Sequence, residues 1–138
     1  MATKNLQVEK LIEDARHSGA TALYLNYLGM QSIPESLFEL THLTELSFSG
    51  NELEALPDEI FQLKHLKTLD LAGNSLSHLP SKIETLNELQ HLDLAYNQFV
   101  HLPEEIGQLK QLEYLDCFAN QLTQLPESLF KCINLNTL

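Results

Sequence analysis

Residues 66–88 read LKTLDLAGNSLSHLPSKIETLNE, and related copies of this stretch recur along the chain at intervals of 23 residues. The period is marked by a repeated dipeptide, which stands at Ile33-Pro34, Leu56-Pro57, Leu79-Pro80, Leu102-Pro103 and Leu125-Pro126. A fixed period of this length indicates a solenoid, because each turn can bury its apolar face only against its neighbours. Stacked turns offer a long open surface rather than a pocket, so this architecture favours the binding of a partner.

The apolar positions of each repeat predict its local structure. Within residues 66–88 they are Leu66, Leu69, Leu71, Leu76, Leu79, Ile83 and Leu86. The alternation around Asp70 predicts a short strand with Leu69 and Leu71 on its buried face. Strands one turn apart must pair in parallel, about 4.8 Å from each other. The spacing of Ile83 and Leu86 predicts a helical or 3₁₀ turn on the return path.

One polar position recurs within this apolar pattern. It is occupied by Asn51, Asn74, Asn97 and Asn120. A buried amide costs free energy unless it is hydrogen-bonded, so we expect these side chains to satisfy backbone groups after each strand. This pattern predicts a structural ladder rather than a ligand site. Leu28 takes the same position in the first repeat and interrupts the ladder there.

The motif LxxLxLxxNxL…LPxxIxxL resembles the leucine-rich repeat family in its intracellular 23-residue form, over residues 20–138. Bacterial repeat proteins, Ras-group scaffold proteins and Roc-type GTPases have similar repeats. The resemblance implies an α/β fold, a right-handed solenoid arc with a parallel sheet on its concave side. It also implies that partners bind through that side, without naming them.

The ends of the chain differ from each other. Residues 1–19 are expected to form an N-terminal capping helix over the solenoid of residues 20–138, which comprises five repeats and the start of a sixth. The helix is predicted from Asn5, a candidate N-cap, to Ser18, with Gly19 ending it and Val8, Leu11, Ile12 and Ala15 facing the core. A partner-binding or membrane-surface helix is the less favoured alternative, because acidic and basic residues are mixed along it.

The C-terminal end lacks a recognisable capping segment. Leu135 and Leu138 fall in core positions of a sixth strand. We expect either that more repeats, a GTPase or a kinase follow in a longer protein, or that another molecule covers this end. The expected state is a monomer, or a weak dimer formed through this end.

Composition excludes several classes of partner. The formal charge of −11 argues against nucleic acid and anionic membranes. It favours a basic partner surface, although it is equally consistent with a role in solubility. No apolar run approaches the ~20 residues that span a bilayer, and no secretion signal is visible. Cys117 and Cys132 occupy core positions, so buried thiols in a cytoplasmic protein are expected, with signal-less export into a host cell as the alternative.

The outward strand positions define the concave face. We predict that its partner-binding residues are Tyr24, Glu45, Asp70, His91, Asp93, Tyr96, Tyr114, Asp116 and Phe118. Asp70, Asp93 and Asp116 share one position in successive repeats and form an aspartate ladder. This ladder is interpreted either as a row of carboxylates that binds Lys or Arg of a partner, or as a charge pattern that reduces aggregation of the sheet. Phe118 is either a partner contact or a residue that a further repeat covers.

Catalysis and cofactor binding are not expected. His91 stands near Asp93, but the sequence has no nucleophile paired with a base and no glycine-rich phosphate loop. His42 with His65, and His78 with His101, form pairs that lack a third metal ligand. Three phenylalanines on the convex side are expected to pack partly under neighbouring turns: Phe38, Phe61 and Phe130.

The sequence therefore predicts a non-catalytic protein–protein interaction module. One form of this hypothesis is a regulator or inhibitor that covers the active site of an enzyme. Two alternatives stay open: the recognition arm of a longer signalling protein, and an assembly element that uses the C-terminal end.

Overall fold

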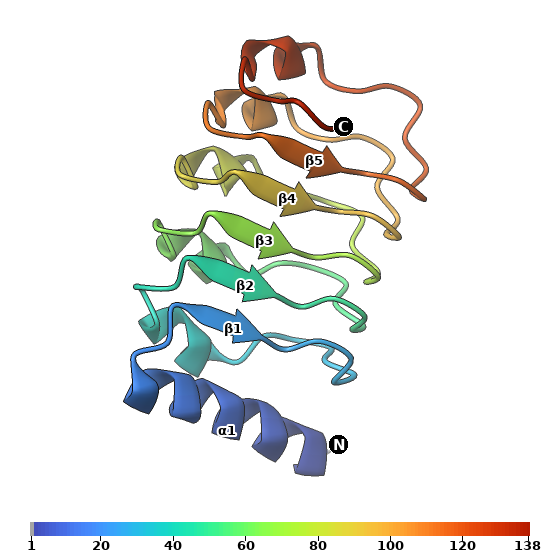
Figure 1. The fold of residues 1–138 in the computed structure, drawn as a ribbon. Helices are drawn as coiled ribbons and strands as arrows, with labels where there is room; N and C mark the ends of the chain where they lie inside the picture. Colours follow the sequence, from blue (N-terminus) through green and yellow to red (C-terminus); the bar gives the residue numbers. More distant parts are fainter. Residues whose placement is uncertain (1) are drawn as a thin grey trace.

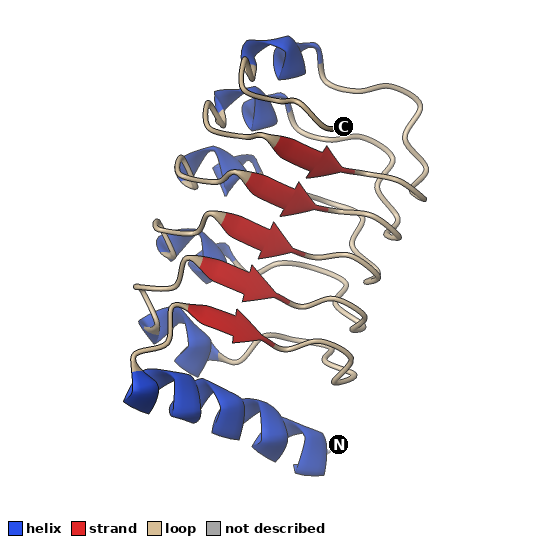
Figure 2. Cartoon of the chain, viewed as in Figure 1, coloured by secondary structure: helices blue, strands red, loops and turns tan. Residues whose placement is uncertain are grey.

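A computed structural model describes residues 2–138 as a stack of five turns with one N-terminal helix across its first end (Figure 1). The helix α1 spans Ala2–Ser18. The strands are β1 (Ala22–Tyr24), β2 (Glu45–Ser47), β3 (Thr68–Asp70), β4 (His91–Asp93) and β5 (Tyr114–Asp116). The 3₁₀ helices are η1 (Glu35–Glu39), η2 (Asp58–Gln62), η3 (Ser81–Thr85), η4 (Glu104–Gln108) and η5 (Glu127–Lys131). Strands line one side of the stack and short helices the other (Figure 2).

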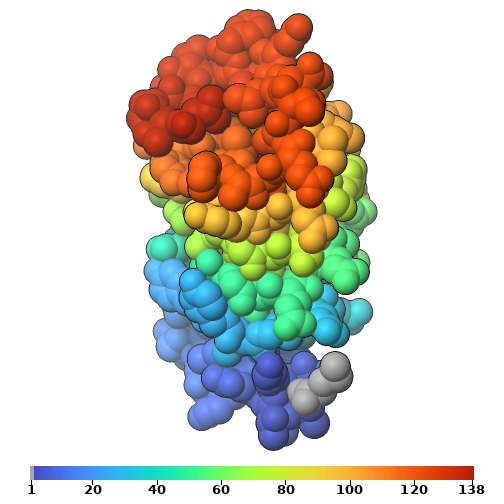
Figure 3. All heavy atoms as spheres, turned by 90° about the vertical axis from the view of Figure 1, so that its right-hand side faces the viewer, coloured from blue at the N-terminus to red at the C-terminus, as the bar shows by residue number. Residues whose placement is uncertain are grey.

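The sheet confirms the predicted parallel pairing. Its strands lie in the order β1-β2-β3-β4-β5. Each strand residue pairs with the residue one repeat later, as Leu46 does with Leu69. The strands are only three residues long, so Leu71 lies just beyond β3 and is nevertheless fully buried. Because each turn occupies its own layer, the chain fills the molecule in sequence order from one end to the other (Figure 3).

The return path of each turn is a 3₁₀ helix, as the Ile-x-x-Leu spacing predicts. A proline with φ between −58° and −70° precedes each of these helices. In the third turn the Leu86 N–H donates to Ile83 O at 3.1 Å, which closes the last turn of η3. Both side chains are fully buried. The apolar spacing thus determines both the helix type and the face that packs on the core.

Helix α1 packs its predicted face, through Val8, Ile12 and Ala15, over β1 and η1. Gly19 ends it with φ +67°, a left-handed conformation that glycine adopts at little cost. The prediction that Asn5 is the N-cap is wrong, because the helix already begins at Ala2. Residues 2–4 contain no helix breaker, so the helix extends over them.

The last turn is less covered than the turns within the stack. Thr137 makes one parallel bridge to Tyr114, while Phe130, Ile133 and Leu138 are 77%, 85% and 63% exposed. The prediction for the convex phenylalanines holds for Phe38 and Phe61, which are buried. It is wrong for Phe130, because no described turn follows to cover it. Cys132 is buried as expected, whereas Cys117 is only half-buried.

Within residues 2–138, no helix is long and apolar enough to cross a membrane.

Candidate functional site

The asparagine ladder fixes the backbone below the concave face. Asn74 Oδ1 accepts the Leu53 N–H at 3.0 Å, and Asn74 Nδ2 donates to the carbonyl oxygens of Phe48 and Leu71, each at 3.0 Å. Asn51, Asn97 and Asn120 make equivalent bonds across neighbouring turns. The residues therefore perform the predicted structural role.

The residue before each ladder position has a left-handed backbone. This column consists of Tyr27, Gly50, Gly73, Tyr96 and Ala119, with φ between 54° and 71°. Only two of the five are glycines, although side chains disfavour this conformation. The turn places the side chains of Tyr27 and Tyr96 beside the concave face, where the rings are 79% and 61% exposed. Sequence reasoning missed this column, although Gly50 and Gly73 at equivalent positions were the signal for it.

The aspartate ladder has a structural role that sequence reasoning missed. Each aspartate accepts the backbone N–H two residues ahead: Ala72 to Asp70 at 3.0 Å, Ala95 to Asp93 at 2.9 Å, and Phe118 to Asp116 at 2.9 Å. These bonds hold the chain as it leaves each strand. All three carboxylates are half-buried.

Asp93 lies in the middle of the aspartate ladder, between Asp70 and Asp116. Burial raises the pKa of Asp93, the hydrogen bond from Ala95 opposes this effect, and the negative charges of Asp70 and Asp116 raise the pKa further. The net pKa lies above the ordinary value of an aspartate. Among the described residues, no Lys, Arg or His forms an ion pair with any of the three carboxylates.

Aromatic rings surround the Asp93 and Asp116 end of the ladder. His91 and Tyr114 stack with ring centroids 5.6 Å apart and planes 23° apart. Tyr96 and Phe118 meet edge to face at 5.7 Å, with Phe118 68% exposed. Burial and the charge of Asp116 raise the pKa of Tyr114, whose hydroxyl donates to Asp116 Oδ2 at 3.2 Å. Of the predicted site residues, the structure thus gathers His91, Asp93, Tyr96, Tyr114, Asp116 and Phe118.

Tyr24 and Glu45 lie at the other end of the same face, on β1 and β2. A hydrogen bond with Glu45 raises the pKa of Tyr24. Between this pair and the aromatic cluster, the buried Ser47 hydroxyl lies 2.6 Å from Asn26 Oδ1 and 3.1 Å from Asp70 Oδ2. The predicted residues therefore form two groups rather than one continuous site.

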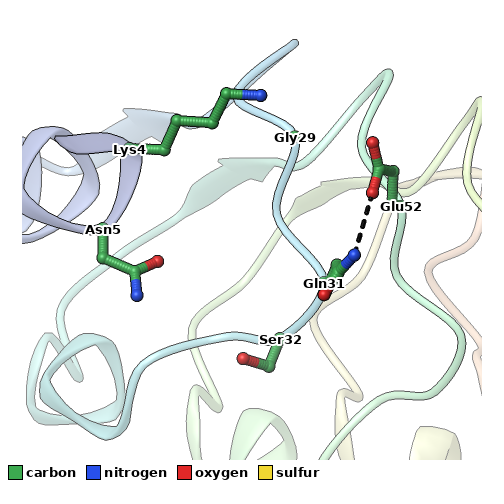
Figure 4. Close-up of a pocket in the computed structure, with 6 residues that line it drawn as sticks. All are labelled: Lys4, Asn5, Gly29, Gln31, Ser32 and Glu52. Carbon is green, nitrogen blue, oxygen red and sulfur yellow. Dashed lines mark hydrogen bonds between the residues drawn. The ribbon is translucent and has the colours of Figure 1, made fainter. Parts of the chain in front are cut away.

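A separate hollow of about 340 Å³ lies between the start of α1 and the turn after β1 (Figure 4). Lys4 extends over Gly29, where a Cβ would lie 2.6 Å from Lys4 Nζ. Gln31 Nε2 donates to Glu52 Oε2 at 3.2 Å on the opposite wall. The lining mixes opposite charges with neutral groups, so it does not select a class of ligand. In the part of the chain that the structure describes, no group of three or more His, Cys, Asp or Glu could hold a metal.

The pattern of leucine rich repeats matches residues 18–76, 41–99 and 64–122, which together cover more than half of the chain. The chain belongs to the leucine-rich repeat family. This fold is typically a protein-interaction module, and the family is generally non-enzymatic. No curated protein matches the chain.

Solved leucine-rich repeat structures resemble this chain over most of its length. A protein of Leptospira interrogans is 39% identical with a TM-score of 0.85, over 91% of this chain and 33% of that protein. The plant peptide hormone receptor RGFR1, in complex with RGF2, is 37% identical with a TM-score of 0.74, over 86% of this chain and 20% of the receptor. The repeat domain of the type III effector XopL is 26% identical with a TM-score of 0.76, over 99% of this chain and 57% of that domain. This leucine-rich repeat chain thus spans about a third of the length of the Leptospira protein.

Proposed function

We propose that this leucine-rich repeat chain is a non-catalytic module that binds a protein partner through its concave face. The observation that carries the proposal is the Tyr96–Phe118 pair, whose rings meet while both stay more than half exposed. Aromatic side chains with this exposure add little to a core, and they are enriched among residues that dominate binding energy.

Rigid presentation supports the same role. Asp116 accepts hydrogen bonds from the Phe118 N–H and from the Tyr114 hydroxyl, which orients all three residues on β5 and just after it. A preorganised surface loses little conformational entropy when a partner associates.

The chemistry of the face favours a partner with a basic surface. The net charge is −11, and the aspartate ladder lies beside the aromatic cluster. Opposite charge accelerates association and disfavours acidic competitors. A regulator or inhibitor that covers the active site of an enzyme, in the cytoplasm, is the form of this function that we propose.

The neighbouring structures support a protein or peptide ligand. RGFR1 is a peptide hormone receptor in complex with RGF2, and a second plant receptor ectodomain, GASSHO1/SCHENGEN3, is in complex with CASPARIAN STRIP INTEGRITY FACTOR 2. This chain matches only 20% and 13% of those receptors. A role as the recognition arm of a longer protein therefore belongs to the same proposal.

Affinity capture from source-cell lysate tests the proposal. The wild type is compared with the double variant Asp93→Lys/Phe118→Ala and with a matched control away from the concave face, Leu6→Ala/Glu59→Lys, after each is shown to be folded by circular dichroism. A captured partner that binds the wild type and the control but not the concave variant supports the proposal. The purified partner must show the same pattern of binding to the three proteins. Equal retention by all three would contradict it.

Assembly through the C-terminal end is a second candidate function. The exposed side chains of Phe130, Ile133 and Leu138 favour it, because exposed apolar side chains near one end of the stack are candidates for contact with another molecule. Copies that associate through this end would leave the concave face open, so the two functions are compatible.

A further inference from the structure

We propose that Asp93 and the aromatic rings around it bind an arginine side chain of the protein partner. This inference rests on the proposed function and names the chemical group that the concave face recognises. The ligand is a guanidinium group presented by a protein, not a free metal ion or an ammonium group.

The hydrogen bonds of the ladder single out one carboxylate oxygen. Asp116 uses Oδ1 for the Phe118 N–H and Oδ2 for the Tyr114 hydroxyl. Asp70 uses Oδ1 for the Ala72 N–H, and its Oδ2 lies 3.1 Å from the Ser47 hydroxyl, which is shared with Asn26 Oδ1 at 2.6 Å. Asp93 uses Oδ1 for the Ala95 N–H, and no donor within residues 2–138 reaches its Oδ2. That oxygen is available to a donor from outside the chain.

The charge of Asp93 also lacks compensation from the chain itself. Its carboxylate is half-buried between Asp70 and Asp116, which pair with it in register across the sheet. A half-buried charge flanked by like charges is destabilised until an opposite charge approaches. A cationic group bound at Oδ2 would supply that charge.

The surrounding rings select guanidinium over ammonium. The His91–Tyr114 stack and the Tyr96–Phe118 pair belong to the same two repeats as Asp93 and Asp116. A guanidinium is planar and weakly hydrated, so it stacks on an aromatic face while its N–H groups reach a carboxylate. An ammonium group is more strongly hydrated and cannot stack in this way. The exposure of Tyr96 and Phe118 keeps this position open to a partner.

Asp70 provides a control within the molecule. It occupies the same column and accepts the same bond from the N–H two residues ahead, but its second oxygen is in contact with the Ser47 hydroxyl at 3.1 Å. Thr68 and Gly73 stand where the repeat of Asp93 has His91 and Tyr96, so the repeat of Asp70 contributes neither of these rings. If the ladder attracted cations only through its total charge, Asp70 and Asp93 would respond alike.

Nuclear magnetic resonance titration of the full chain tests the inference. The probes are N-acetyl-arginine amide and N-acetyl-lysine amide, and the reporters are the amides of Ala95 and Phe118, which donate to Asp93 and Asp116. We expect saturable shifts with the arginine probe and binding about two- to fivefold weaker with the lysine probe. Asp93→Asn should weaken arginine binding by roughly tenfold. Asp70→Asn should change it by less than about twofold.

Equal binding of the two probes, or equal effects of Asp93→Asn and Asp70→Asn, would overturn the inference. Asparagine at position 93 can still accept the Ala95 N–H, and an unchanged spectrum elsewhere checks that the variant stays folded. If capture depends on Phe118 but neither probe binds at Ala95, the concave site stands and the arginine assignment is wrong. That result differs from failure of the proposed function, in which capture would not distinguish the concave variant from the control.

Discussion

At the scale of single residues, the chain places bulky side chains where its backbone favours glycine. Tyr27, Tyr96 and Ala119 share a left-handed column with Gly50 and Gly73. A non-glycine residue in this region costs about 1–2 kcal/mol. The tyrosines use the position to place their rings beside the concave face, whereas Ala119 gains no comparable contact.

This contrast predicts opposite effects within one column. Ala119→Gly should raise the free energy of unfolding by about 1 kcal/mol, because it relieves the left-handed strain without removing a large side chain. Gly73→Ala should lower it by at least about 1 kcal/mol, because φ is +65° there and the new Cβ would lie 3.3 Å from Gly50 N. Urea denaturation measures both changes, and two changes of the same sign would contradict the argument.

The raised pKa of Asp93 predicts a pH-dependent stability difference. The folded state binds the proton more tightly than the unfolded state, so the charged carboxylate destabilises the fold at neutral pH. Asp93→Asn should therefore be more stable than the wild type at pH 7, and the difference should shrink as the pH falls through the folded-state pKa. Melting temperatures measured from neutral to acidic pH test this, with Glu59→Gln as an exposed control. A difference that grows in acid would refute the interpretation.

At the scale of elements, the last two 3₁₀ helices approach each other closely at one glycine. Gly107 on η4 faces Ser128 on η5, and a Cβ at Gly107 would lie 2.4 Å from Ser128 Cβ and 2.6 Å from Ser128 O. Ser128 is also bonded to Glu104 through both its N–H and its hydroxyl. The last helix is thus held by close backbone packing on η4.

Gly107→Ala should consequently overpack this contact. We expect a loss of about 1–3 kcal/mol in the free energy of unfolding, because the clash involves backbone that cannot rotate away. Glu84→Ala lies at the same position on η3 and serves as the control, with little expected change. Urea denaturation of both variants provides the measurement, and equal stability of Gly107→Ala and the wild type would show that η5 moves without cost.

At the scale of the whole molecule, the two ends of the stack have different surfaces. Helix α1 buries one face and exposes charged residues, together with Leu6. The last turn exposes Phe130, Ile133 and Leu138, and residues 121–138 carry only Glu127 and Lys131 as charged side chains. Two such ends can meet without the like-charge repulsion that the rest of this acidic chain would create.

Self-association of residues 1–138 should therefore depend on this end. We expect a concentration-dependent dimer in sedimentation velocity that is lost in Ile133→Glu/Leu138→Glu. Leu6→Glu is the matched control, since Leu6 is 69% exposed at the opposite end and its replacement should leave association unchanged. A purely monomeric wild type at high concentration would exclude the second candidate function for this chain.

Much of the fold and some of the candidate site could be predicted from the 23-residue period. The spacing of leucines determines which residues face inward. That is why the parallel register, the 3₁₀ turns and the asparagine ladder could be predicted from local pattern alone. The composition of the concave face, including Asp93 and Phe118, follows from the same alternation.

The tertiary structure alone decided which of these equivalent positions differ. Phe61 and Phe130 share a column, yet one is 3% and the other 77% exposed, because burial depends on whether a following turn covers the side chain. Asp70 and Asp93 also share a column, yet only the second carboxylate oxygen of Asp70 lies against a serine hydroxyl. A repeat sequence determines the direction of each side chain, whereas contacts between turns determine its exposure, its hydrogen bonds and its pKa.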